Sequence, residues 1–182
     1  MTRTQLACAL AFMFVAAAAV PHGRTPPLRV VPDVDLQRYS GTWYEVARLP
    51  NRFEKNCAGD ITATYAPRPD GRITVTNRCR KTDGTINEAS GVARRVKNQP
   101  PSVLQVRFAP SYLSFLPMVW GDYNIIELGP AYDYAVVGSH DRKYLWVLSR
   151  TPRIDRTLYR SLLDRAKAQG FDTSTMIEVA NR

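Results

Sequence analysis

A long series of short β-type runs constrains this chain more than any other feature. Between residues 42 and 149, β-branched or aromatic runs alternate with clusters of turn residues, and no segment of helical length interrupts them. Consecutive strands joined in this way favour an antiparallel up-and-down meander and exclude the strand–helix–strand units of a parallel sheet. The expected strands are 42–49, 61–66, 72–80, 103–108, 123–128, 134–138 and 144–149.

Helical signals flank this series on both sides. Asp35 can cap one short helical turn that stops before Gly41. Asp155 can cap a longer helix that Gly170 ends. The apolar positions between them recur three and four residues apart, at Leu158, Tyr159, Leu162, Leu163 and Ala166. We expect this helix to pack on the outside of a barrel, and residues 173–179 to add a short closing strand.

The first twenty residues have the pattern of an export signal. Arg3 is followed by an apolar run over 6–20, and the small residues 17–19 suit a cleavage site. A run of about 15 apolar residues is shorter than the roughly 20 that span a bilayer, which disfavours the alternative of an uncleaved anchor. We therefore predict a signal peptide over 1–20, a linker over 21–32 and one domain over 33–182.

Composition and charge fit an exported, soluble domain. Hydrophobic residues make up 45% of the chain and charged residues 23%, as in ordinary globular proteins. The formal charge of +9 falls by one when Arg3 is removed. Such a surplus of positive charge can attract anionic membrane surfaces. In the alternative interpretation it only keeps the protein soluble, because the cations are scattered and form no basic block. Export disfavours nucleic acid as a partner, and we predict a periplasmic or secreted protein, with association to the outer membrane left open.

Two cysteines remain when Cys8 leaves with the signal peptide, an even pair in an exported chain. A turn over 67–71 allows a register in which Tyr65 faces Gly71 and Cys57 faces Cys79. All these positions share one parity, so they lie on one face of the hairpin. We predict a structural Cys57–Cys79 disulfide, with a redox role as the alternative, and an interior face that carries the apolar side chains.

Three motifs resemble those of the lipocalins. Residues 41–45, Gly-Thr-Trp-Tyr-Glu, match the family's Gly-x-Trp signature at the start of the first strand. Tyr-Asp-Tyr at 132–134 is similar to the second motif, and Leu-Ser-Arg-Thr-Pro at 148–152 to the third. The resemblance extends over 33–179 and is closest to bacterial lipocalins and the apolipoprotein D-like group. It implies an eight-stranded antiparallel up-and-down β-barrel, closed at one end, that binds fatty-acid or lysophospholipid-like ligands.

The resemblance also assigns expected roles within the barrel. Trp43 would plug the closed end, and the Arg150 guanidinium would stack on its indole as a structural contact. Small side chains at Ala47, Ala63, Ala89 and Ala93 would leave room for one ligand, whereas the alternative is a fully packed barrel. Strand parity gives the expected lining: Ala47, Ile61, Ala63, Tyr65, Ile73, Val75, Val106, Phe108, Tyr123, Val137 and Trp146.

Residues 110–121 are expected at the open end of the barrel, and we call this segment the mouth loop. It is rich in apolar residues, among them Phe115, Leu116 and Trp120. Such a loop closes over a ligand or meets a membrane or partner, or else it folds back to extend two strands.

Catalytic signals are weak. The two histidines, His22 and His140, belong to no cluster with metal-ligand spacing, and no nucleophile has a recognisable context. We therefore expect no metal, no cofactor and no catalytic residue. Glu45, of inward parity, is the one acidic residue suspected of functional burial, pairing with an interior arginine or meeting a polar ligand group.

These observations predict binding, storage or transport of a small hydrophobic ligand in cell-envelope lipid handling. The alternatives are a barrel enzyme acting on a small lipophilic substrate, or a packed barrel that binds a partner. The oligomeric state stays open, a homodimer included.

Overall fold

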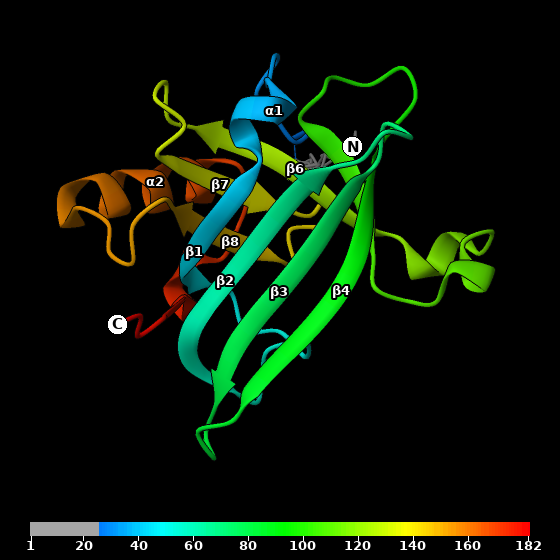
Figure 1. Ribbon diagram of the computed structural model, residues 1–182. Coiled ribbons are helices and arrows are strands. Elements are labelled where there is room, and N and C mark those ends of the chain that lie inside the picture. The colour runs from blue at the N-terminus through cyan, green and yellow to red at the C-terminus, as the bar shows by residue number, and fades with distance from the viewer. Residues whose placement is uncertain (1–25) are drawn as a thin grey trace, which may run out of the picture.

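Residues 26–182 are described by the computed structural model of this chain (Figure 1). The predicted signal peptide over 1–20, including Cys8, and the first part of the predicted linker lie outside the described residues.

Eight antiparallel strands follow one another around a barrel, and the pairing of β1 with both β8 and β2 closes it. A ninth short strand pairs with β1. The predicted eight-stranded up-and-down barrel is confirmed. The strands are β1 (Gly41–Arg48), β2 (Cys57–Pro67), β3 (Ile73–Lys81), β4 (Ile86–Arg95), β5 (Val103–Arg107), β6 (Gly121–Leu128), β7 (Tyr134–Gly138), β8 (Leu145–Ser149) and β9 (Ile177–Glu178).

Helices flank the barrel as the capping signals predicted. Helix α1 (Leu36–Tyr39) begins after Asp35, and α2 (Arg156–Ala168) begins after Asp155, whose side chain accepts a hydrogen bond from the amide of Leu158 at 2.8 Å. Figure 1 shows α2 on the outside of the barrel and α1 at one end of it. Three short 3-10 turns complete the elements: η1 (Ser111–Leu113), η2 (Pro117–Val119) and η3 (Thr173–Thr175).

Two apolar clusters divide the core between the inside and the outside of the barrel. The outer cluster lies between the wall and the buried side of α2, which consists of Tyr159, Leu162 and Ala166. Leu28 and Val30, within the stretch predicted as a linker, also pack against it. The interior cluster contains Val34, Tyr39, Trp43, Tyr65, Ile73, Val75, Ala93, Leu104, Ile125, Ala135, Val137 and Leu148.

The two ends of the barrel carry different segments. The end that holds α1, the β2–β3 turn and the β6–β7 loop is the closed end. The other end, which we call the open end, carries the β1–β2 loop over 49–56, the β3–β4 turn and the β5–β6 loop with the mouth loop. Among residues 26–182, no helix has both the length and the apolar character needed to span a membrane.

One strand was missed by the sequence analysis. β4 pairs with β3 over residues 86–93, although its sequence lacks an alternation of large apolar and polar residues. The positions of β4 that share a face with buried Ala93 are Gly91 and Ala89, both too small to give a strand signal.

The predicted register of the β2–β3 hairpin is wrong by four residues, because Tyr65 pairs with Val75 and not with Gly71. Gly71 instead occupies the turn with φ +74°, a conformation that glycine adopts without strain. The shift is even, so the side chains of residues 62–67 keep their predicted faces. Irregular pairing between Cys57 and Thr62 then brings the two cysteines within reach, and the predicted Cys57–Cys79 disulfide is present.

A bulge in β1 overturns a second parity argument. The register with β8 shifts between Glu45 and Ala47, so the inward alternation that begins at Trp43 is broken there. Ala47, expected to line the ligand space, is fully buried in the outer cluster under α2. The interior position passes to Arg48, which pairs with the side chain of Glu45.

Candidate ligand-binding barrel

The closed end is built around the Gly-x-Trp segment at the start of β1. Trp43 is fully buried, and its indole nitrogen donates a hydrogen bond to the carbonyl of Tyr39 at 2.8 Å. Gly41 adopts φ +90°, and a Cβ there would lie 3.4 Å from the Arg150 guanidinium. The glycine therefore provides both the turn into the strand and the space for the arginine.

Arg150 joins three separate segments at this end. Its Cζ lies 3.9 Å from the centre of the Trp43 ring, in cation–π geometry. Its guanidinium also donates hydrogen bonds to the carbonyls of Arg38, Tyr39, Ser40, Thr42 and Tyr132. Because these carbonyls belong to α1, β1 and the β6–β7 loop, the three sequence motifs converge on one structural centre.

Three tyrosines form a chain of hydroxyl groups above the closed end. Tyr123 is the middle member, and its hydroxyl lies 2.8 Å from those of Tyr39 and Tyr65. Burial is the main cause that raises the pKa of all three phenols, so they stay neutral. Tyr39 was not expected in the interior, because its position next to a helical turn gave no strand parity.

One row of interior positions runs across four strands. The pairing places Trp43 beside Ala63, Ala63 beside Asn77, and Asn77 beside Ala89. Trp43 is buried, Ala63 and Asn77 are half-buried, and Ala89 is exposed. Solvent therefore reaches this row from the β4 side, where the side chains are small. The Asn77 carboxamide oxygen is buried and lacks a hydrogen-bond partner among the described residues.

The remaining expected lining residues divide into two groups. Tyr65, Ile73, Val75 and Val137 belong to the interior cluster, and Ala63, Val106, Tyr123 and Trp146 pack against it.

Ile61 and Phe108 lie outside that cluster. Ile61 is buried beside the irregular part of β2, and its amide bonds to the Asn181 side chain. Phe108 is 43% exposed. A Cβ on Gly91 would fall 2.7 Å from the Phe108 ring, so the glycine makes room for the aromatic side chain.

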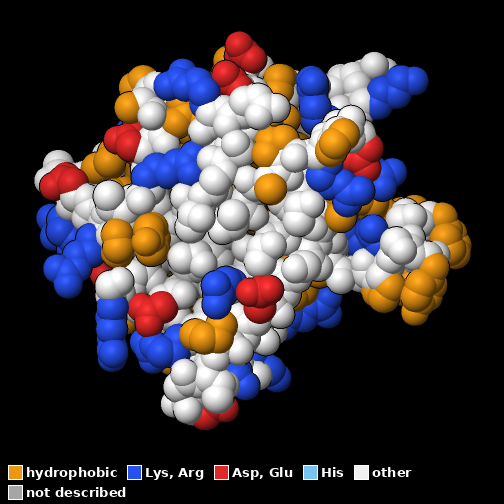
Figure 2. Space-filling view, viewed as in Figure 1, with side chains coloured by type: hydrophobic (Ala, Val, Ile, Leu, Met, Phe, Trp, Pro, Cys, Tyr) orange, Lys and Arg blue, Asp and Glu red, His pale blue; other side chains and the backbone are white. Residues whose placement is uncertain are grey.

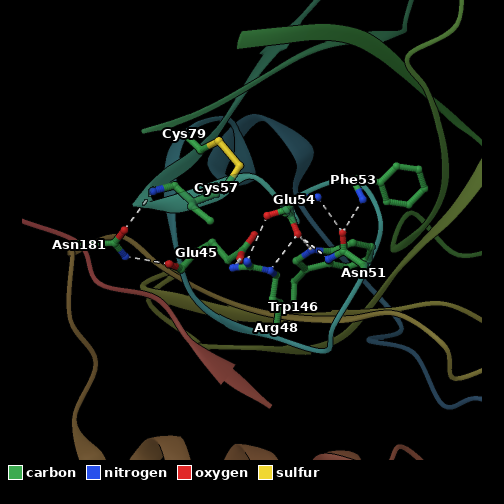
Figure 3. The surroundings of a disulfide bond; sticks show 10 residues. Glu45, Arg48, Asn51, Phe53, Glu54, Cys57, Cys79, Trp146 and Asn181 are labelled. Carbon is green, nitrogen blue, oxygen red and sulfur yellow. Dashed lines mark hydrogen bonds and ion pairs between the residues drawn. A yellow bond between two sulfur atoms is a disulfide. The ribbon is translucent and has the colours of Figure 1, made fainter. Parts of the chain in front are cut away.

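Charged side chains lie between the barrel wall and the β1–β2 loop (Figure 3). The Arg48 guanidinium contacts Glu45 at 3.0 Å and Glu54 at 3.3 Å. The indole nitrogen of Trp146 lies 3.4 Å from the Glu54 carboxylate, which also accepts a bond from Asn51 at 2.5 Å. Glu54 thus ties the loop to β1 and β8. Glu45 fulfils the first of its two predicted roles, pairing with an interior arginine.

Two carboxylates share the single guanidinium of Arg48. Burial, and then the nearby Glu54 carboxylate, raise the pKa of Glu45 well above its usual range, although Arg48 opposes both effects. Burial therefore favours the protonated form of the Glu45 carboxyl.

Asn181 closes the wall on the other side of this cluster. Its side chain accepts a hydrogen bond from the Ile61 amide at 3.0 Å and donates one to the Glu45 carbonyl at 2.7 Å. Figure 3 shows this bridge next to the Cys57–Cys79 disulfide. A single polar residue near the end of the sequence carries no signal for such a role.

The mouth loop lies against the outer surface of the barrel. Its Trp120 ring stacks on Arg94 with 3.7 Å between Cζ and the ring centre. Arg94 follows the interior residue Ala93 directly, so it points outward. Leu116 is half-buried and Phe115 is exposed. The loop therefore does not close over the interior.

Groups for catalysis are scattered in the part of the chain that the structure describes. His140 is exposed, and its neighbour Asp141 accepts a hydrogen bond from Ser139 at 2.7 Å. Among residues 26–182, no group of three or more His, Cys, Asp or Glu side chains is placed to hold a metal.

Comparisons with known proteins agree with this geometry. A family model described as "Lipocalin-like domain" matches residues 34–181. The chain is 38% identical over 177 residues to the outer membrane lipoprotein Blc of Escherichia coli (strain K12), covering 96% of this chain and 94% of that one. It is 30% identical over 162 residues to apolipoprotein D of Mus musculus, covering 85% and 80%. Lobster apocrustacyanin A1 superposes with a TM-score of 0.63 at 16% identity, covering 80% and 79%.

Proposed function

The chain belongs to the lipocalin family, and from this premise we propose that it binds, stores or transports one fatty acid or lysophospholipid inside its barrel. The acyl chain would lie along the interior face between Tyr65 and Ala93. The proposal treats the chain as a binding protein and not as an enzyme.

The row from Trp43 to Ala89 is the observation that carries this proposal. It runs from the large, buried Trp43 to the small, exposed Ala89, so the interior face is accessible on the β4 side and sealed at the plug. A lipid chain entering there would exchange water for apolar surface, at about 25 cal/mol per Å² of area buried. The unpaired oxygen of Asn77 offers a hydrogen-bond acceptor for a hydroxyl or amide of the ligand.

The test fills the proposed space. Ala63→Trp adds an indole to the middle of the row and should abolish uptake of a fluorescent fatty acid while the protein stays folded. Ala66→Trp is the matched control, because Ala66 lies on the same strand, is exposed and has the opposite parity. The wild-type protein and the control should bind with micromolar or tighter affinity, about −8 kcal/mol.

Two results would contradict the proposal. One is a wild-type protein that takes up neither fatty acids nor lysophospholipids and carries no lipid after purification. The other is a folded Ala63→Trp variant that binds as tightly as the control.

The place of action is part of the same proposal. We propose that residues 1–20 are removed as a signal peptide and that residues 33–182 act as one exported domain, periplasmic or secreted and in contact with the outer membrane. A homodimer is compatible with this function, and light scattering of the purified domain tests it.

A further inference from the structure

The mouth loop carries the most exposed large apolar side chains of the described residues. Tyr112 is 74% exposed, Phe115 76% and Met118 85%. We call these three residues the apolar knob. Figure 2 shows hydrophobic side chains gathered on a protrusion at the right edge of the molecule, with Lys and Arg side chains beside it. Contiguous apolar surface of this kind is rare on soluble domains unless it meets another apolar phase.

The loop that holds the knob is fixed by specific bonds on its inner side. Buried Arg107 donates hydrogen bonds to the carbonyls of Ala109 and Pro110. The Trp120 indole nitrogen donates to the Ser114 carbonyl at 2.9 Å, while its ring stacks on Arg94. Two 3-10 turns, η1 and η2, shape the chain between these anchors. The apolar side chains therefore point outward from an ordered support, and little entropy remains to be lost on binding.

Exposed cations accompany the knob. Arg94, Arg95 and Lys97 are exposed, and the Arg94 guanidinium stacks on Trp120 of the mouth loop. Cations beside an apolar tip complement an anionic lipid surface, because the tip enters the acyl region while the cations stay at the headgroups.

We propose that the apolar knob inserts into the surface of an anionic phospholipid membrane and docks the barrel there. This goes beyond the proposed ligand binding and is independent of it, since the loop lies outside the barrel. A second copy of the chain fits the knob less well than a membrane does. A stable dimer buries roughly 1,000 Å² or more with matching shape, whereas the knob is a narrow protrusion of three side chains.

Vesicle co-sedimentation tests the proposal with the domain as purified. The wild-type protein should bind vesicles of mixed phosphatidylglycerol and phosphatidylcholine, and bind pure phosphatidylcholine vesicles more weakly. Phe115→Ser/Met118→Ser should lower the partition onto anionic vesicles at least tenfold, because two large apolar side chains no longer leave water. Ile177→Ser is the matched control: Ile177 is also exposed, at 41%, but lies on β9 away from the loop.

The outcomes separate the alternatives. Fluorescent fatty-acid uptake by the double variant should equal that of the wild type, which shows that the variant is folded and that the knob is no part of the ligand site. Equal vesicle binding by the wild type and the double variant would overturn the proposal. So would a wild-type protein that binds no vesicles but forms a dimer in light scattering that the double variant cannot form. Equal binding to anionic and neutral vesicles would remove the proposed role of the cations.

Discussion

The two ends of this barrel are stabilised in different ways. At the closed end, Trp43 is fully buried and one guanidinium satisfies carbonyls from three segments, so packing and hydrogen bonds suffice. Towards the open end, interior positions are small or half-exposed, and the wall there is held by the Cys57–Cys79 bond and the buried ion pairs of Arg48. At that end, a covalent bond and charge pairs take the place of close packing.

The largest expected effect follows from removing the covalent bond. Cys57→Ala/Cys79→Ala should lower the free energy of unfolding by roughly 3 kcal/mol in the chain-entropy model, for a sequence separation of 22 residues. Urea unfolding measures the loss, and reduction of the wild-type protein should reproduce it. If the stability is unchanged, packing alone holds the open end and the contrast between the ends is wrong.

At the closed end, Arg150→Ala should cost about 2 kcal/mol of unfolding free energy, through loss of the indole stack and of hydrogen bonds to carbonyls. Ligand affinity of the folded variant should be little changed, because Arg150 lies below the plug. Arg153→Ala, at an exposed arginine nearby, is the control for chemical denaturation. A collapse of affinity without loss of stability would make Arg150 a ligand residue.

The charged cluster around Arg48 should have a smaller effect, which appears as a pH dependence of the unfolding free energy. The pKa of Glu45 is raised in the folded state, so above its unfolded value of about 4.3 the folded protein holds a proton that the unfolded chain has released. This contribution makes stability fall as the pH rises through that window towards the folded pKa. Glu45→Gln cannot ionise, and its unfolding free energy should therefore fall less over the same interval. Glu88→Gln, in the exposed pair with Arg78, is the control, and it should follow the wild-type profile. Parallel profiles for all three proteins would show that Glu45 is ionised in the fold.

Much of the barrel could be predicted because apolar alternation and turn residues are local signals. Strand β7 was predicted with its observed bounds, and both helix caps were identified. β4 was missed because Ala89 and Gly91 leave its interior face without large apolar side chains. The small side chains on this face of β4 thus remove the signal by which the strand could have been predicted.

The errors at the candidate site have a different cause. The parity of a position predicts its face only while the strand pairing is regular. The bulge between Glu45 and Ala47 arises in the pairing of β1 with β8, a strand about a hundred residues away in the sequence. The interior position of Arg48 and the bridging role of Asn181 follow from that irregularity. No local pattern in a single sequence predicts such a bulge.

The chain of tyrosines above the plug also gives the molecule an intrinsic optical reporter. Tyr39 lies 4.9 Å from Trp43 between ring centres, and Tyr65 lies 5.6 Å from Tyr39, so light absorbed by these phenols can be passed to the indole. Because burial raises the pKa of these phenols, they resist conversion to phenolate in alkaline solution while the closed end is intact. Ultraviolet difference spectra can therefore follow the opening of that end in real time, without an attached dye.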